Sequence, residues 1–184
     1  MARIGADVPW ARAGVGAIAT QSFFNTGYGP DGLRLLSGGL TPEHVAARLT
    51  SDDAGRGRRQ LGIVDAKGRT AAYTAADCMP WAGHATVDGC CVQGNALLGP
   101  SVLDGVAQAF VRTSGTLAER LVAALAGGQR HGGDRRGMQS AVLLVVRERG
   151  GPEGFGDHAI DLRVDDHALP IEELQRLLSP RLGS

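Results

Sequence analysis

The sequence predicts an α+β fold, a layered α-β-β-α sandwich in which helices cover two antiparallel sheets. Strand-like runs occur in neighbouring groups, and amphipathic helical segments occur in pairs between them, as expected when helices pack on the outer faces of antiparallel sheets. Aromatic residues make up only 4% of the chain, and glycine accounts for 28 of its 184 residues. This composition favours close-packed layers of small aliphatic side chains joined by tight turns. At this length we expect one domain, residues 1–184.

The first half of the chain is expected to alternate between strands and helices. The expected elements are a strand over residues 15–23, a helix over 31–36, a helix that begins after Thr41, and strands over 60–64 and 70–75. The first helix should end at Gly38-Gly39. Thr41, Pro42 and Glu43 supply an N-cap, a proline at the first helical position and an acid in the first turn. Residues 65–68 have the composition of a hairpin turn.

The second half repeats this organisation. The expected elements are a strand over residues 85–93, helices over 101–110 and 116–126, strands over 140–147 and 159–164, and a helix over 170–178. Gly99-Pro100-Ser101 should begin the first of these helices, and Gly127-Gly128 should end the second. Residues 77–84 form a polar loop between two strands, a common location for functional groups.

Charge and composition narrow the possible partners. The formal net charge is zero, which argues against a nucleic-acid partner. No apolar run approaches the roughly 20 residues of a membrane span, and no phosphate-binding glycine motif indicates a cofactor. The three cysteines Cys78, Cys90 and Cys91 form an odd set, which indicates reduced thiols and a cytoplasmic location. Their spacing fits no standard zinc pattern, so no metal site is expected.

The loop over residues 77–84 brings an acid, a thiol and an imidazole close together in sequence. His84 is a candidate acid/base or substrate-orienting group, or else a loop histidine bonded to backbone. Asp77 is a candidate catalytic partner of His84. Cys78 either helps to bind substrate, acts as a nucleophile with His84 as base, or is simply a small buried thiol.

Two further groups of polar residues lie near predicted strand ends. Gln93 and Asn95 are two positions apart and should point the same way, either toward a substrate or into the following turn. Asn95 is assigned to catalysis and Gln93 to substrate binding. In Asp134-Arg135-Arg136, one arginine is a candidate to recognise a substrate carboxylate, and Asp134 is a candidate to hold that arginine or the α-amino group of a nucleophile. The alternative is a structural Asp–Arg pair. Gln139, at a strand entrance, is a weaker substrate-binding candidate.

Several motifs together resemble one family, DUF1028. They are Val8-Pro9-Trp10-Ala11-Arg12-Ala13-Gly14-Val15-Gly16-Ala17, Arg59-Gln60-Leu61-Gly62-Ile63-Val64, the Asp77 to His84 loop, Gln93-Gly94-Asn95, Gly133-Asp134-Arg135-Arg136-Gly137 and Asp161-Leu162-Arg163-Val164-Asp165. The resemblance covers nearly the whole chain. It implies the fold of the N-terminal nucleophile (Ntn) hydrolases, and it implies a reaction class without naming a substrate.

Enzymes of this type use the first residue of the mature chain, a Thr, Ser or Cys, as nucleophile and its own α-amino group as base. The resemblance implies an opening hairpin before the Pro-Trp-Ala-Arg motif, but only residues 1–8 precede Pro9. Removal of Met1 would leave Ala2, which carries no nucleophile. We therefore expect either a longer natural protein with an upstream start or a degenerate form of the family. Loss of an internal hairpin would leave unpaired backbone and an exposed apolar groove.

These inferences leave two hypotheses of function. The first is an Ntn-type amidohydrolase-like protein that acts on a small polar amide or another non-peptide C–N bond, inactive as written because its nucleophile lies upstream. The second is a non-catalytic small-molecule binding or assembly protein with the same fold. The resemblance also implies a homo-oligomer.

Overall fold

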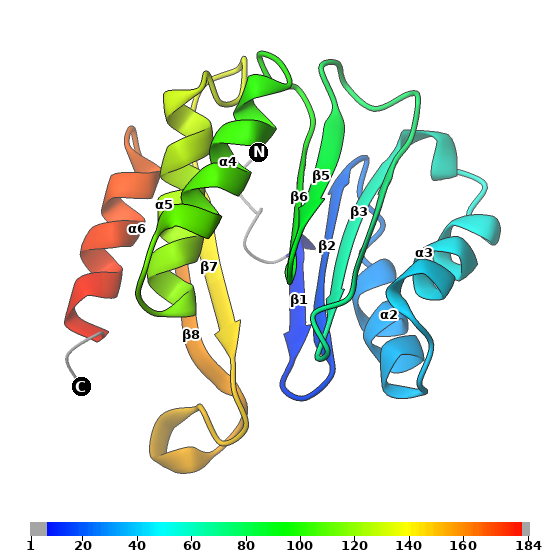
Figure 1. Cartoon of the computed structure of the whole chain (residues 1–184), viewed down its shortest axis with the longest axis horizontal. Helices are drawn as coiled ribbons and strands as arrows, with labels where there is room; N and C mark the ends of the chain where they lie inside the picture. Colours follow the sequence, from blue (N-terminus) through cyan, green and yellow to red (C-terminus); the bar gives the residue numbers. More distant parts are fainter. Residues whose placement is uncertain (1–6, 182–184) are drawn as a thin grey trace.

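The computed structural model describes residues 7–181 as a mixed α+β fold (Figure 1). Its strands are β1 (Pro9–Arg12), β2 (Gly16–Ser22), β3 (Arg59–Asp65), β4 (Thr70–Thr74), β5 (Gly83–Val87), β6 (Cys90–Gly94), β7 (Ala141–Val146) and β8 (His158–Val164). Its α-helices are α2 (Tyr28–Ser37), α3 (Pro42–Ser51), α4 (Ser101–Arg112), α5 (Leu117–Arg130) and α6 (Pro170–Leu178). Short 3₁₀ turns are η1 (Arg56–Arg58), η2 (Pro152–Gly154) and η3 (Ser179–Arg181).

The strands form three antiparallel sheets within residues 7–181. One sheet has four strands in the order β1-β2-β3-β4, and the hairpins β5–β6 and β7–β8 form two more. The expected α+β class with antiparallel sheets is confirmed. The two continuous sheets of the sequence prediction are not seen in this range, because no described strand joins the β5–β6 hairpin to the β7–β8 hairpin.

Each sheet has its own apolar core against helices. Helices α2 and α3 cover the four-stranded sheet through a core that includes Ile18, Leu61 and Val45. Helix α4 packs on the β5–β6 hairpin around Val92. Helices α5 and α6 pack on β7–β8, where Leu174 is fully buried. Figure 1 shows α2 and α3 on one flank of the molecule and α6 on the opposite flank.

The largest correction to the sequence prediction concerns residues 85–93. The expected single strand is instead a hairpin, β5 and β6, that turns at Asp88-Gly89. Gly89 has a φ of 66°, the left-handed conformation that an Asp-Gly hairpin turn requires. His84 consequently lies in strand β5 rather than in a loop.

Two glycines expected to end a helix lie inside one. Gly127 and Gly128 are buried in α5, which continues to Arg130. A Cβ atom at Gly127 would lie 2.5 Å from the carbonyl oxygen of Gly105 on α4. These glycines therefore allow the two helix backbones to approach closely, and the expected helix stop at residue 126 is wrong.

Smaller differences occur near the N-terminus. Strand β1 was not expected, and it pairs with β2 in register, with Trp10 opposite Ile18. Helix α2 begins at Tyr28, before the expected position, because Pro30 is tolerated in a first helical turn. The cap at Thr41 is confirmed, since its side chain accepts a hydrogen bond from His44 N. Met1 and Ala2, on which the expectation about the N-terminus depends, lie outside residues 7–181.

Candidate functional site

One face of the β5–β6 hairpin lies against the four-stranded sheet. His84 is directly opposite Gln93 in the hairpin register, so the two side chains share this face. Gln93 Nε2 donates a hydrogen bond of 2.8 Å to Ala19 O on β2. Asn95 Nδ2 donates to Gln60 Oε1 on β3, at 3.2 Å. Gln93 and Asn95 thus both reach the same sheet, as their spacing predicts.

The two adjacent cysteines point to opposite faces of β6. Cys91 Sγ lies 3.7 Å from Ala71 O on β4, whereas Cys90 packs in the core beneath α4. Burial raises the pKa of the Cys91 thiol to about 11 and also raises the pKa of Cys90. At neutral pH both are therefore protonated thiols, which are poor nucleophiles and poor metal ligands.

Gln60 is the centre of the polar contacts between the two layers, a role that was not predicted from its position in the motif at residues 59–64. Its side chain is fully buried at the start of β3. Gln60 Nε2 lies 2.8 Å from Gly94 O and 3.0 Å from Gly83 O, the carbonyl groups of a facing pair in the hairpin. Gln60 therefore joins the hairpin to the sheet, as well as contacting Asn95.

A threonine links Gln60 to the candidate histidine. Thr74 Oγ1 at the end of β4 lies 3.0 Å from Gln60 Nε2 and 2.9 Å from His84 Nδ1. The contacts form one chain of hydrogen-bonding groups: His84, Thr74, Gln60 and Asn95. His84 is exposed at one end of this chain, and Asn95 is half-buried at the other. We call these four residues the Gln60 network.

Asp77 and Cys78 do not join the Gln60 network. Cys78 is buried, and its thiol donates to Arg59 O at 3.3 Å. Asp77 is exposed, and its backbone N–H donates to Gly57 O. These contacts favour the interpretation of Cys78 as a small buried thiol, because both its thiol and the His84 ring bond to other groups.

Asp134 and Arg135 lie against the chain that leaves Asn95. The backbone N–H of Arg135 donates to Ala96 O at 2.9 Å, and its guanidinium donates to Leu97 O at 3.2 Å. Asp134 instead forms an ion pair with Arg136, with a shortest N–O distance of 2.5 Å. Burial alone would raise the pKa of Asp134, but the hydrogen bonds from Arg136 outweigh it and lower that pKa. The carboxylate is therefore ionised and committed to a structural pair.

Gln139 lies in a different part of the molecule. Its side chain is 3.5 Å from Asp166 Oδ1, and its carbonyl accepts a hydrogen bond from His167 N. Gln139 thus holds the segment between β8 and α6, and the structure does not bring it to the Gln60 network.

Two hydroxyl groups on β2 have buried oxygen atoms. Thr20 is fully buried on the face that packs against α2 and α3, opposite Leu61. The hydroxyls of Thr20 and Ser22 have no hydrogen-bond partner among the described residues. Thr20 therefore belongs to the apolar core rather than to the Gln60 network.

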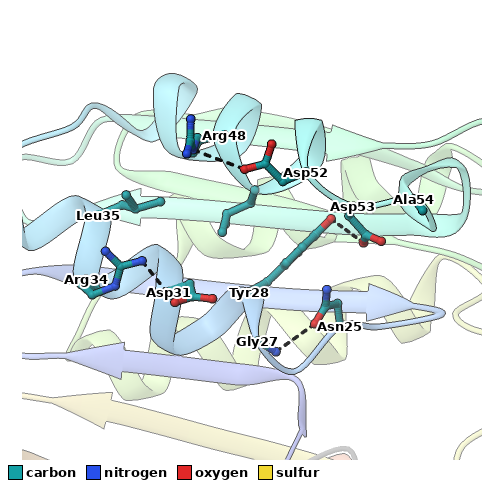
Figure 2. A pocket seen from close by; sticks show the side chains of 11 residues that line it. Asn25, Gly27, Tyr28, Asp31, Arg34, Leu35, Arg48, Asp52, Asp53 and Ala54 are labelled. Carbon is teal, nitrogen blue, oxygen red and sulfur yellow. Dashed lines mark hydrogen bonds and ion pairs between the residues drawn. The ribbon is translucent and has the colours of Figure 1, made fainter.

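A cavity of about 430 Å³ between α2 and α3 contains none of the residues proposed from sequence. Figure 2 shows Arg34 paired with Asp31, and Tyr28 directed toward Asp53. The Tyr28 hydroxyl donates to Asp53 at 2.8 Å, and Arg59 Nε donates to the same carboxylate at 2.7 Å. The carboxylate of Asp53 therefore ties the loop after α3 to the start of β3.

The contacts of Asp53 predict how the free energy of unfolding depends on pH. Hydrogen bonds from Arg59 and Tyr28 outweigh desolvation and hold the pKa of Asp53 well below its usual range. The unfolded chain therefore takes up a proton near pH 4 that the folded chain does not, so this stabilisation is complete at neutral pH and lost progressively below about pH 4. Asp53→Asn should lower the free energy of unfolding at neutral pH by about 2 kcal/mol.

The neighbouring residue supplies a matched control for this measurement. Asp52 pairs with Arg48 at 3.5 Å, and both side chains are about two-thirds exposed. Asp52→Asn should therefore change stability by less than about 0.5 kcal/mol. Urea unfolding at several pH values between neutral and about 3 measures both variants. Equal losses in the two variants, or an Asp53→Asn difference that does not shrink in acid, would contradict the assignment.

Metal-ligand clusters and membrane-spanning helices are both absent from residues 7–181. Residues 7–181 contain no group of three or more His, Cys, Asp or Glu side chains placed to hold a metal ion. No helix in this part of the chain is long and apolar enough to cross a membrane.

Fold and site together define an α+β protein in which the β5–β6 hairpin is held on a four-stranded sheet by the Gln60 network. The chain belongs to the DUF1028 family, a family of unknown function whose model matches residues 1–174. It is also similar to the crystal structure of protein SPO2555 from Silicibacter pomeroyi, which is described with the same family. The two sequences are 32% identical with a TM-score of 0.87, over 96% of this chain and 74% of the other. Comparison with curated proteins gives no match.

Proposed function

We propose that this chain provides the scaffold of an Ntn-type amidohydrolase that acts on a small polar amide or another non-peptide C–N bond. The observation that carries the proposal is the Gln60 network, which places an imidazole and a carboxamide in one connected chain between two β layers. Amide hydrolysis needs a group that protonates the leaving nitrogen and polar groups that hold the substrate. His84 takes the first role in this proposal, and Asn95 takes the second.

The nucleophile of the proposed reaction comes from an N-terminal Thr, Ser or Cys upstream of the described residues. Its oxygen or sulfur attacks the amide carbonyl carbon, and its proton passes to its own α-amino group. The C–N bond breaks as the nitrogen takes a proton, and water then releases the acid from the acyl-enzyme. Strands β6 and β7 each have one hydrogen-bonded neighbour among the described strands. Their free edges support this proposal, because an additional hairpin could pair there.

The test compares three proteins in an assay for ammonia or amine release from a panel of small polar amides. They are the 184-residue chain, a version extended by the in-frame codons upstream of Met1, and the extended version with its processed first residue changed to Ala. Hydrolysis by the extended version alone is expected. His84→Ala should lower its kcat by about 100-fold, in line with the loss of a general acid. A well-folded extended protein without hydrolysis, or with hydrolysis that survives the change of its first residue, would overturn the proposal.

The second candidate function is a non-catalytic protein that binds a small molecule and assembles with further copies of itself. Two contacts favour this candidate. The Asp134 carboxylate is paired with Arg136, and the Gln93 side-chain amide is hydrogen-bonded to Ala19 O. Neither group is free for chemistry in this arrangement. Thermal stabilisation by amides without turnover, together with an oligomer seen by light scattering, would select this candidate over the hydrolase.

A further inference from the structure

The orientation of the Gln60 carboxamide is fixed by the groups around it. Gly83 O and Gly94 O are carbonyl oxygens, which only accept hydrogen bonds. Both lie within 3.0 Å of Gln60 Nε2, so the NH₂ end of the carboxamide must face them. The opposite end, Oε1, therefore faces Asn95.

The orientation of the Gln60 carboxamide also fixes the orientation of the Asn95 side chain. Gln60 Oε1 only accepts hydrogen bonds, so Asn95 turns its Nδ2 group inward to donate at 3.2 Å. Asn95 Oδ1 is left without a hydrogen-bond partner among residues 7–181. Asn95 is half-buried, so this oxygen is available as an acceptor for a bound group.

The same reasoning applies to the other branch of the network. The nitrogen of a carboxamide does not accept hydrogen bonds, so Thr74 Oγ1 accepts from Gln60 Nε2, whose two hydrogens are shared among Thr74 Oγ1, Gly83 O and Gly94 O. Thr74 Oγ1 also lies 2.9 Å from His84 Nδ1, and we assign the Thr74 hydroxyl as the donor in this contact. A neutral His84 that accepts at Nδ1 carries its proton on Nε2. In this tautomer the exposed ring offers an N–H donor at Nε2.

We propose that Gln60 is a positioning residue that sets the polarity of the site, so that Asn95 presents an acceptor and His84 presents a donor. An acceptor and a donor together complement a primary or secondary amide, whose N–H and C=O groups offer the opposite pair. The site should accordingly prefer amides that carry an N–H over esters and N,N-disubstituted amides. This inference deepens the hydrolase proposal, on which its choice of substrate class rests, but the polarity itself is measurable without turnover.

The test uses ¹⁵N NMR of the side chains in the folded protein. In the wild type, the Asn95 side-chain NH₂ should be protected from hydrogen exchange, and neutral His84 should carry its proton on Nε2. Gln60→Met should accelerate exchange of the Asn95 NH₂ on the order of tenfold, as expected for one lost hydrogen bond. An unprotected Asn95 NH₂, a proton on His84 Nδ1, or unchanged exchange in Gln60→Met would overturn the inference.

A second variant keeps the inference testable if Gln60→Met does not fold. Thr74→Val removes the contact to His84 and leaves the bond between Gln60 and Asn95 in place. It should change the His84 ring signals while the Asn95 NH₂ stays protected, and the reverse pattern would count against the proposed polarity. Thr70→Val is the matched control, because Thr70 is four residues earlier on the same face of β4, opposite Val64. It should leave both signals unchanged.

The outcome is separable from that of the hydrolase proposal. A protein that shows the expected NMR signals but no hydrolysis would support the proposed polarity and contradict the hydrolase proposal. A protein that hydrolyses amides but whose Asn95 side-chain NH₂ is unprotected from hydrogen exchange would support the hydrolase proposal and contradict the proposed polarity.

Discussion

Gln60→Met is expected to lower the free energy of unfolding by about 3 kcal/mol, although methionine has nearly the same volume as glutamine. The substitution removes the hydrogen-bonding partner of Gly83 O, Gly94 O and Asn95 in one step. A buried acceptor that loses its partner costs about 1–3 kcal/mol. The midpoint of urea unfolding should therefore fall without a change in the slope.

Gln93→Met is the control for this prediction. Gln93 is the same residue type in the same interface, but its side-chain nitrogen bonds to only one carbonyl group, Ala19 O. Its replacement should cost about 1 kcal/mol. A Gln60→Met loss no larger than that of Gln93→Met would show that Gln60 does not hold the hairpin on the sheet.

Gly62→Ala is the second substitution with a large expected effect, a loss of about 3 kcal/mol from overpacking and a broken hydrogen bond. A Cβ atom at this position on β3 would lie 1.8 Å from Gln93 Oε1 and 3.0 Å from Cys91 Sγ. The Gln93 side chain cannot simply swing away, because its nitrogen is bonded to Ala19 O. Glycine is therefore required here by the close approach of the hairpin, not by an unusual φ.

A double-mutant cycle separates this steric effect from other costs of the substitution. Gln93→Ala removes the atoms that the new methyl group would meet, so the double variant Gly62→Ala with Gln93→Ala should be more stable than the sum of the single losses predicts. Gly99→Ala is the control for glycine replacement, since no atom lies within 4 Å of a Cβ there. Additive losses in the cycle would refute the proposed clash.

Helix caps and turns could be predicted from the sequence, because each depends on residues that are close together in the chain. The cap at Thr41 was found from sequence because capping depends on residues within one helical turn. The turn at residues 65–68 was found for the same reason, since it depends on a few neighbouring residues. The Asp88-Gly89 turn carried an equally local signal, but the apolar run on both sides of it was interpreted as one strand.

Contacts between distant segments were not predictable in this way. A glycine pair in a helical pattern ordinarily ends the helix, yet Gly127 continues α5 because the backbone of α4 passes close beside it. Arg136, rather than Arg135, is the partner of Asp134, because the Arg135 guanidinium reaches Leu97 O instead. Both outcomes depend on how separate elements pack.

The sequence by itself determined the α+β class, the family resemblance and most helix and strand positions, and it named His84, Gln93 and Asn95 as candidates. Only the tertiary structure decided which polar groups meet. Gln60 lies in the family motif at residues 59–64 but was not identified as a site residue, because a single glutamine at the start of a strand gives no local sign of its contacts. Its partners Gly83 and Gly94 lie 23 and 34 residues further along the chain. A buried carboxamide gains its role only when folding places distant carbonyl groups within hydrogen-bonding distance of it.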